Sequence, residues 1–132
     1  MKYICLGYMD ETKWDAMNDN ERNHFIDECF AYDDVLRESG NCIGGEALQE
    51  ARNAATVKFQ NGKVSVTDGP FVETKEQLGG LMFLEARDLN HAIQLMSKHP
   101  SIRMGGSFEI RPTADLSEMI AESEKRRAVK MK

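Results

Sequence analysis

The residues of this chain best able to do chemistry gather in one segment, residues 65–80, which reads SVTDGPFVETKEQLGG. Asp68 ends a strand-like run there, and Gly69-Pro70 makes the chain turn directly after it. A carboxylate at the end of an apolar strand can serve as a general acid or base, or as an anchor for a ligand's hydrogen-bond donor. It is equally typical of a turn in which the side chain accepts backbone N–H bonds, here from Phe71 or Val72. The sequence leaves both interpretations open.

The preceding residues predict which way Asp68 faces. They read TVKFQNGKVSVT, and Asn61-Gly62 is the pair favoured in a two-residue hairpin turn, because both central positions need positive φ. This turn sets a register in which four apolar side chains share one face. They are Val57, Phe59, Val64 and Val66. Asp68 has the same parity as the valines of the second strand, so we expect it to be mostly buried, hydrogen-bonded and at the border of the main cleft.

Further ionisable groups follow Asp68. Glu73, Lys75 and Glu76 form either a solvated face or part of a ligand site, and Gly79-Gly80 permits either a close backbone approach or a bulge at a strand start. We predict Glu73 and Lys75, together with Tyr8 of the first strand, as ligand-binding residues.

His24 is the second candidate for chemistry. It lies one turn into the first predicted helix, beside the apolar stripe, where a histidine is either a boundary residue or a proton-transfer group with an acid nearby. We take Asp68 and His24 as candidate catalytic residues, and assign no role to His91 or His99. The three cysteines form no CxxC pair, so we expect neither a metal site nor a cofactor.

Length and charge restrict the function further. A chain of 132 residues forms one domain with a single core. The net charge of −5 argues against nucleic-acid binding, although residues 121–132 carry five Lys or Arg and only two Glu, which leaves about −8 on the rest. No run reaches the ~18 apolar residues of a membrane span, and no signal peptide is recognisable. An odd number of cysteines suits a reducing compartment, so we expect a cytoplasmic protein.

The elements that must position these groups follow from hydrophobic periodicity. Strands are predicted over residues 2–9, 42–48, 79–86 and 107–111, besides the hairpin. One helix begins at Asn18 or Asn20 and runs to about Ser39, and a second begins after Asp88 and stops at Pro100. The motif Asp115-Leu-Ser-Glu118 resembles a capping box for a C-terminal helix.

Without the hairpin, the predicted order is strand, helix, strand, strand, helix, strand. This is the order of an α+β, ferredoxin-like split βαβ unit, in which two helices cover one face of a four-stranded antiparallel sheet. The strands at residues 2–9 and 79–86 are apolar on both sides, and such strands do not remain against water. We therefore expect a homodimer formed through the sheet face opposite the helices.

Four segments resemble one known family. They are GEALQ (45–49), TVKFQNGKVSVTDGPFVETKEQLGG (56–80), LEARDLNHAI (84–93) and EIRP (109–112). Together they are similar to the YCII-related, DGPF-domain proteins over residues 1–113. The resemblance implies a dimeric α/β-barrel built on the ferredoxin-like fold, with residues 114–132 outside it as a C-terminal helix or basic tail.

The resemblance implies less about activity. YCII-related proteins are thought to use a His–Asp pair in a cleft, with the histidine on the first helix, and His24 and Asp68 are the residues at comparable places here. DGPF-domain proteins are also often associated with extracytoplasmic-function sigma factors. We therefore expect a small-molecule-binding or regulatory accessory protein, linked to such a sigma factor. The alternative is a small cofactor-independent enzyme of hydrolase or lyase type, with an acid–base site near Asp68 and His24.

Overall fold

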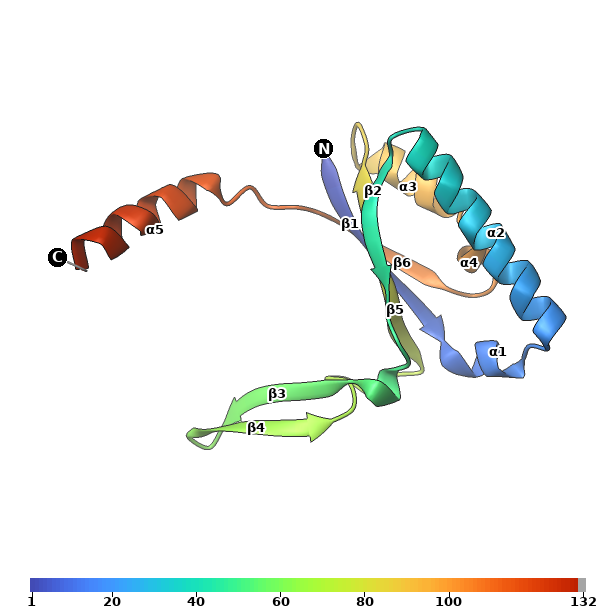
Figure 1. Cartoon of the computed structure of the whole chain (residues 1–132), viewed down its shortest axis with the longest axis horizontal. Helices are drawn as coiled ribbons and strands as arrows, with labels where there is room; N and C mark the ends of the chain where they lie inside the picture. Colours follow the sequence, from blue (N-terminus) through green and yellow to red (C-terminus); the bar gives the residue numbers. More distant parts are fainter. Residues whose placement is uncertain (131–132) are drawn as a thin grey trace.

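The computed structural model describes residues 1–130, and its elements alternate as the periodicity predicts (Figure 1). The strands are β1 (Lys2–Asp10), β2 (Cys42–Ala47), β3 (Ala55–Gln60), β4 (Lys63–Asp68), β5 (Glu76–Glu85) and β6 (Ser107–Pro112). The helices are α1 (Glu11–Ala16), α2 (Asp19–Glu38), α3 (Leu89–Ser97), α4 (Pro100–Arg103) and α5 (Ser117–Lys130), with a 3-10 turn η1 (Ala51–Asn53). None of these helices combines the length and the apolarity needed to cross a membrane.

Four strands form one antiparallel sheet in the order β2-β5-β1-β6. The fold is thus α+β, with a four-stranded antiparallel sheet, a separate β3–β4 hairpin and a C-terminal helix. The β1–β5 register shifts at Gly7 and Tyr8, opposite Gly79-Gly80. The two glycines lie inside β5, so the bulge interpretation holds for them, and β5 begins three residues earlier than predicted.

Local sequence signals explain where the helices begin and end. Asn18 and Glu21 form a reciprocal capping box at the start of α2, and Gly40 takes the left-handed conformation (φ 80°) just after its end. Asp88 caps α3, as predicted. Pro100 does more than stop α3, because it also starts α4, a helix that the sequence analysis missed. At the C-terminal helix, Asp115 accepts a bond from Ser117 N–H, and the expected capping box with Glu118 is replaced by this shorter turn.

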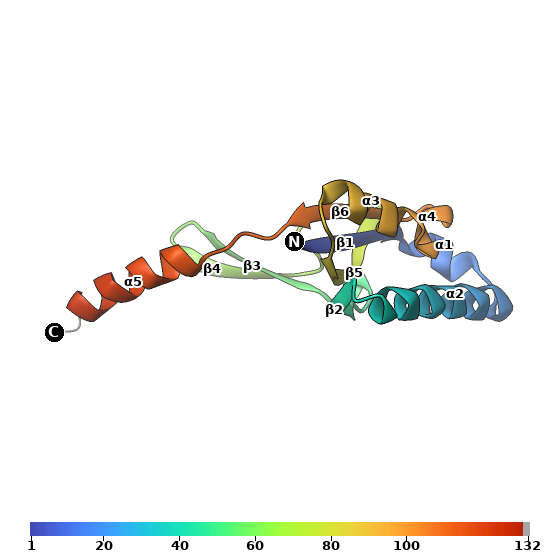
Figure 2. The same ribbon diagram turned by 90° about the horizontal axis from the view of Figure 1, so that it is seen from above.

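The core lies between one face of the sheet and the helices α2 and α3 (Figure 2). Tyr3 and Cys5 of β1 and Leu84 of β5 point into it, and they meet Leu36 of α2 and Met96 of α3. Alternation along each strand places the next residues on the opposite face. All four helices before β6 lie on the core side, so the other face of the sheet is left open (Figure 2).

The hairpin has the predicted turn and register but not the predicted position. Asn61 and Gly62 have positive φ (53° and 79°), and the pairing runs from Gln60–Lys63 out to Ala55–Asp68. However, the hairpin projects from the sheet and no side chain in it is buried (Figure 1). The valine face is therefore not a core face within one chain. The expectation that Asp68 is buried is wrong for this reason.

Candidate functional site

A hollow of about 570 Å³ lies between α2 and the sheet; we call it the α2 cavity. Aromatic and aliphatic side chains supply much of its wall, among them Phe25, Phe30, Met82 and Phe108. Backbone from residues 44–47 and 79–80 lines it as well. Gly80 allows this close packing, because a Cβ there would lie 3.1 Å from the carbonyl oxygen of Glu46. The cavity is thus mostly apolar, and its few polar groups stand out.

The most prominent polar group is a histidine facing an aspartate. His99 precedes α4 and is only 8% exposed, while Asp33 projects from α2. His99 Nε2 and Asp33 Oδ1 are 3.5 Å apart. The imidazole is held edge-on by Phe108 and Tyr32, with ring centroids 5.0 and 5.9 Å away. Two elements far apart in the sequence therefore bring an acid and an imidazole together inside an apolar cavity.

Hydrogen bonds fix the orientation of the imidazole. The backbone N–H of Ser101 donates to His99 Nδ1 (3.2 Å), and Ser101 Oγ lies 2.8 Å from the same nitrogen. Because Nδ1 accepts this hydrogen bond, the neutral ring carries its hydrogen on Nε2. That hydrogen faces Asp33. His99 thus caps α4 with one nitrogen and presents a donor to the carboxylate with the other.

Asp33 is the incompletely satisfied member of the pair. Its Oδ1 is buried and makes no hydrogen bond with any of the described residues. At 3.5 Å the His99 contact is too long to count as a good hydrogen bond. A buried acceptor without a partner costs about 1–3 kcal/mol. The carboxylate is therefore ready to accept a hydrogen bond from a molecule in the cavity.

Other ionisable residues line the same cavity, among them Cys29 and Arg37. Burial, and then the charges of Asp33 and Glu28, raise the pKa of the Cys29 thiol to about 11. Cys29 is therefore protonated at neutral pH and is a poor nucleophile. Arg37 binds Asp34 Oδ1 at 2.8 Å and remains half exposed, which puts a positive charge at the rim.

The predicted catalytic residues do not form a site within one chain. Asp68 is exposed, its side chain makes no hydrogen bond with another described residue, and it lies outside the α2 cavity. The turn after it is held by backbone instead, since Gly69 N–H donates to the Ala54 carbonyl at 2.7 Å. His24 has a 78% exposed side chain, and its Nε2 lies 2.8 Å from Glu28 Oε1. The expected position of Asp68 at the main cleft is wrong because the hairpin leads away from it.

The predicted ligand-binding residues fall into two separate places. Tyr8 lines the α2 cavity. Glu73 and Lys75 line a second hollow of about 390 Å³, beside Asp10 at the end of β1. Lys75 Nζ is 3.9 Å from the buried carboxylate of Asp10. A hydrogen bond from the Thr12 side chain is the main cause that lowers the pKa of Asp10.

The sequence contained weak signals for the residues that were missed. Asp33 follows Phe25 and Cys29 at intervals of four, so it is an acid on the apolar stripe of the helix. His99 stands directly before a proline that can begin a helix, which is the place of a capping residue. Neither signal predicts that the two side chains meet. Among residues 1–130, no group of three or more His, Cys, Asp or Glu is arranged to hold a metal ion.

Comparison with known proteins supplies a family. A family model described as "YCII-related domain" matches residues 1–117. An uncharacterized protein of Rhizobium meliloti (strain 1021) is 33% identical over 118 residues, which span 86% of this chain and 93% of the relative. The match thus extends from β1 to the first residue of α5.

Proposed function

The chain belongs to the YCII-related domain family, and on that premise we propose that it binds a small molecule in the α2 cavity, with Asp33 and His99 as the polar contact. One observation carries this proposal: Asp33 Oδ1 is buried in a mostly apolar cavity and makes no hydrogen bond within residues 1–130, His99 Nε2 being 3.5 Å away. A volume of about 570 Å³ falls within the usual range for ligand pockets. Binding would give the orphan carboxylate the partner it lacks.

The wall of the cavity indicates the chemistry of the ligand. Its body should be apolar or aromatic, because it would lie against Phe25, Met82 and Phe108. One end should carry a hydroxyl, amide or ammonium donor that reaches Asp33. A second, anionic group at the other end would suit Arg37 at the rim.

Acid–base catalysis is the second candidate function, and the same pair favours it. When a neutral imidazole faces an ionised carboxylate, both nitrogens of His99 are engaged, one by Ser101 and one towards Asp33. Asp33 is therefore the group left to accept a proton from a substrate, and His99 would orient and stabilise its carboxylate. Such chemistry needs no metal or organic cofactor.

Substitution of two aspartates of α2, one in the cavity and one outside it, tests the binding site. A thermal-shift screen of small aromatic and aliphatic alcohols, amines and carboxamides should first yield a binder. Asp33→Asn should then weaken its affinity roughly 10–100-fold, since a hydrogen bond to a charged group contributes about 1.5–3 kcal/mol. Asp27→Asn, at an exposed aspartate of the same helix that does not line the cavity, should leave affinity unchanged. Equal effects of both variants would contradict the proposal.

Turnover separates the two candidate functions. If Asp33 is a base, Asp33→Asn should lower kcat by roughly 10²–10⁴-fold, while the protein still binds substrate. If the protein only binds its ligand, the bound molecule should be recovered unchanged after long incubation with the wild-type chain. Mass spectrometry of the ligand distinguishes these results.

We extend the proposal to the assembly. The strand order β6-β1-β5-β2 corresponds to a ferredoxin-like split βαβ sheet. Its open face carries Ile4 and Leu6 of β1, paired with Phe83 and Leu81 of β5. An apolar sheet face of this kind is covered in stable proteins. A second copy, packed sheet to sheet as a dimeric α/β-barrel, would cover it.

A further inference from the structure

We propose that the β3–β4 hairpin and α5 are two arms that grip a second copy of this chain against the open sheet face. This inference rests on the proposed dimeric barrel and goes beyond it, because it assigns a task to two segments that contain no buried residue among those described. The occupant to which we commit is a second copy.

The hairpin presents an apolar face without a partner. Val57, Phe59, Val64 and Val66 lie on this face by register, and they are 63–73% exposed. On the other face, Lys58 Nζ lies 4.8 Å from the ring centroid of Phe71, so the following loop covers the polar side. An isolated two-stranded hairpin is at best marginally stable in water. This hairpin therefore needs a surface outside its own chain.

Helix α5, like the hairpin, presents exposed apolar side chains. Leu116, Met119 and Ile120 are spaced as one side of a helix, and all three are exposed. No residue of α5 is buried. The last backbone contact of the chain with the sheet before α5 is the bond from Thr113 N–H to the Lys2 carbonyl, at 3.1 Å. Beyond it, the described chain leads away from its own core.

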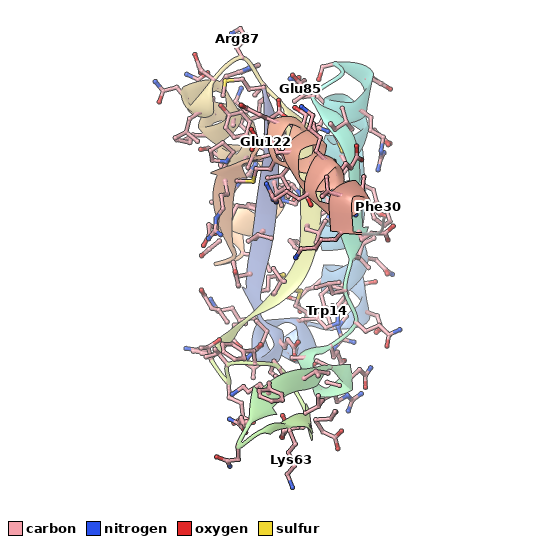
Figure 3. The ribbon with its side chains drawn as sticks, turned by 90° about the vertical axis from the view of Figure 1, so that its left-hand side faces the viewer. Trp14, Phe30, Lys63, Glu85, Arg87 and Glu122 are labelled. Carbon is pink, nitrogen blue, oxygen red and sulfur yellow. The ribbon has the colours of Figure 1, made fainter. Side chains whose placement is uncertain are left out.

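Both arms extend on the same side of the sheet. In Figure 1 the helices of the core lie on one side, and α5 and the hairpin extend from the upper and lower ends of the sheet on the other. Figure 3 looks onto the open face, with α5 and its Glu122 crossing above and the hairpin with Lys63 below. Between them are the paired residues Ile4–Phe83 and Leu6–Leu81. The open sheet face and the two arms thus lie on one side of the molecule.

Charge favours a second copy of this chain as the occupant of that side. The last part of α5 carries Lys125, Arg126, Arg127 and Lys130, whereas the chain outside residues 121–132 has a net charge of about −8. A basic arm therefore complements the acidic body of an identical molecule. In a two-fold dimer each apolar surface also contributes to the interface twice, once from each copy. Sheet face, hairpin and helix together can supply the roughly 1,200–2,000 Å² of a standard interface.

Sedimentation of arm variants tests the inference. Phe59→Asp with Val64→Asp, a directly paired couple, alters the hairpin arm, and Met119→Asp with Ile120→Asp alters the helical arm. Each double variant should raise the dissociation constant of the dimer at least about 100-fold, because each loses burial of large apolar side chains in both copies. Val35→Asp, an equally exposed apolar residue on α2, is the control and should leave dimerisation unchanged.

Two further measurements distinguish loss of the dimer contact from loss of the hairpin's own structure. Phe59→Thr with Val64→Thr keeps strand-forming residues and removes apolar area, so it should also weaken the dimer. Hydrogen exchange of the wild-type chain should protect residues 55–68 and 117–130 at high concentration and release them on dilution.

The possible outcomes are distinct. If the wild-type chain is a dimer and no arm variant weakens it, the proposed role of the arms is contradicted and the proposed dimeric barrel is not. A wild-type chain that is monomeric at all concentrations would overturn both. Weakening by Val35→Asp as strongly as by the arm variants would also overturn the assignment, because the effect would then not be specific to the arms.

Discussion

At the scale of single residues, the candidate site depends on His99 performing three tasks. It caps α4 through Nδ1, packs edge-on against Phe108, and directs Nε2 towards Asp33. The bond from Ser101 N–H prevents the ring from turning, so the donor that faces the cavity is fixed by local backbone geometry. Substitution at this position can separate capping from the contact with Asp33.

We predict that His99→Asn and His99→Ala differ in stability but not in ligand binding. Asparagine is a good capping residue, whereas alanine removes the cap, so His99→Ala should be less stable than His99→Asn by about 0.5–2 kcal/mol. Both variants lack the donor that faces Asp33, and both should bind the ligand weakly. Urea denaturation and calorimetry check the two parts. Full affinity in His99→Asn would show that the imidazole is only structural.

Two thiols predict how stability depends on alkaline pH. Burial raises the pKa of Cys5 and of Cys29 from 9.0 to about 11. Between pH 9 and 11 the folded chain therefore keeps protons that the unfolded chain has lost, and the free energy of unfolding should fall as pH rises through this range. Denaturation at pH 8, 9.5 and 11 measures this effect. Replacing both thiols by Ala or Ser should flatten the dependence, and an unchanged slope would contradict the assignment.

The same pKa governs the reactivity of Cys29. At pH 7.5 its thiol should react with iodoacetamide much more slowly than the cysteines of the urea-unfolded chain, because the thiolate is the reactive form. Peptide mass spectrometry reports the rate at this one position. A rate equal to that of the unfolded chain would contradict the raised pKa.

At the scale of elements, glycine is required for one reason in the sheet that forms the core and for another in the hairpin. A Cβ at Gly45 of β2 would lie 2.6 Å from the carbonyl oxygen of Leu81, so the neighbouring backbone leaves no room for it. At Gly62 of the hairpin turn a Cβ would meet nothing within 4 Å, although the φ of 79° strains any other residue. The first glycine is required by packing and the second by conformation alone.

We therefore predict that Gly45→Ala destabilises the chain more than Gly62→Ala does. The clash in the sheet should cost roughly 2–3 kcal/mol, and the positive φ in the turn roughly 1–2 kcal/mol, paid mainly within the hairpin. Chemical denaturation followed by circular dichroism measures both. A larger loss for Gly62→Ala would mean that the hairpin contributes to the core.

At the scale of the whole molecule, the two sides of the sheet differ in kind. One side is closed by α2 and α3 over the core, and the α2 cavity lies there. The other side is open, with apolar residues of β1 and β5 at its centre and an arm at each end (Figure 1). Ligand binding and assembly are thus assigned to opposite faces of one sheet. The link to a sigma factor, which the family resemblance implied, stays a prediction.

Removing α5 tests this division. A chain that ends at residue 116 should unfold at nearly the same denaturant concentration when measured as a monomer, because no residue of α5 is buried. Its dimer should be weaker, and its affinity for a cavity ligand should be unchanged. Unfolding of the shortened chain would contradict the peripheral place of this helix.

The sequence by itself determined the strands, the long helices and the hairpin turn, because periodicity, caps and Asn-Gly turns act over a few residues. It also determined the family, through a long local motif. Only the tertiary structure decided the site. Asp33 and His99 meet because α2 and α4 border the same cavity, and contacts between residues 66 positions apart leave no local pattern. The tertiary structure equally removed Asp68 from the cavity, because the register fixes which face a side chain shares but not whether that face meets a core.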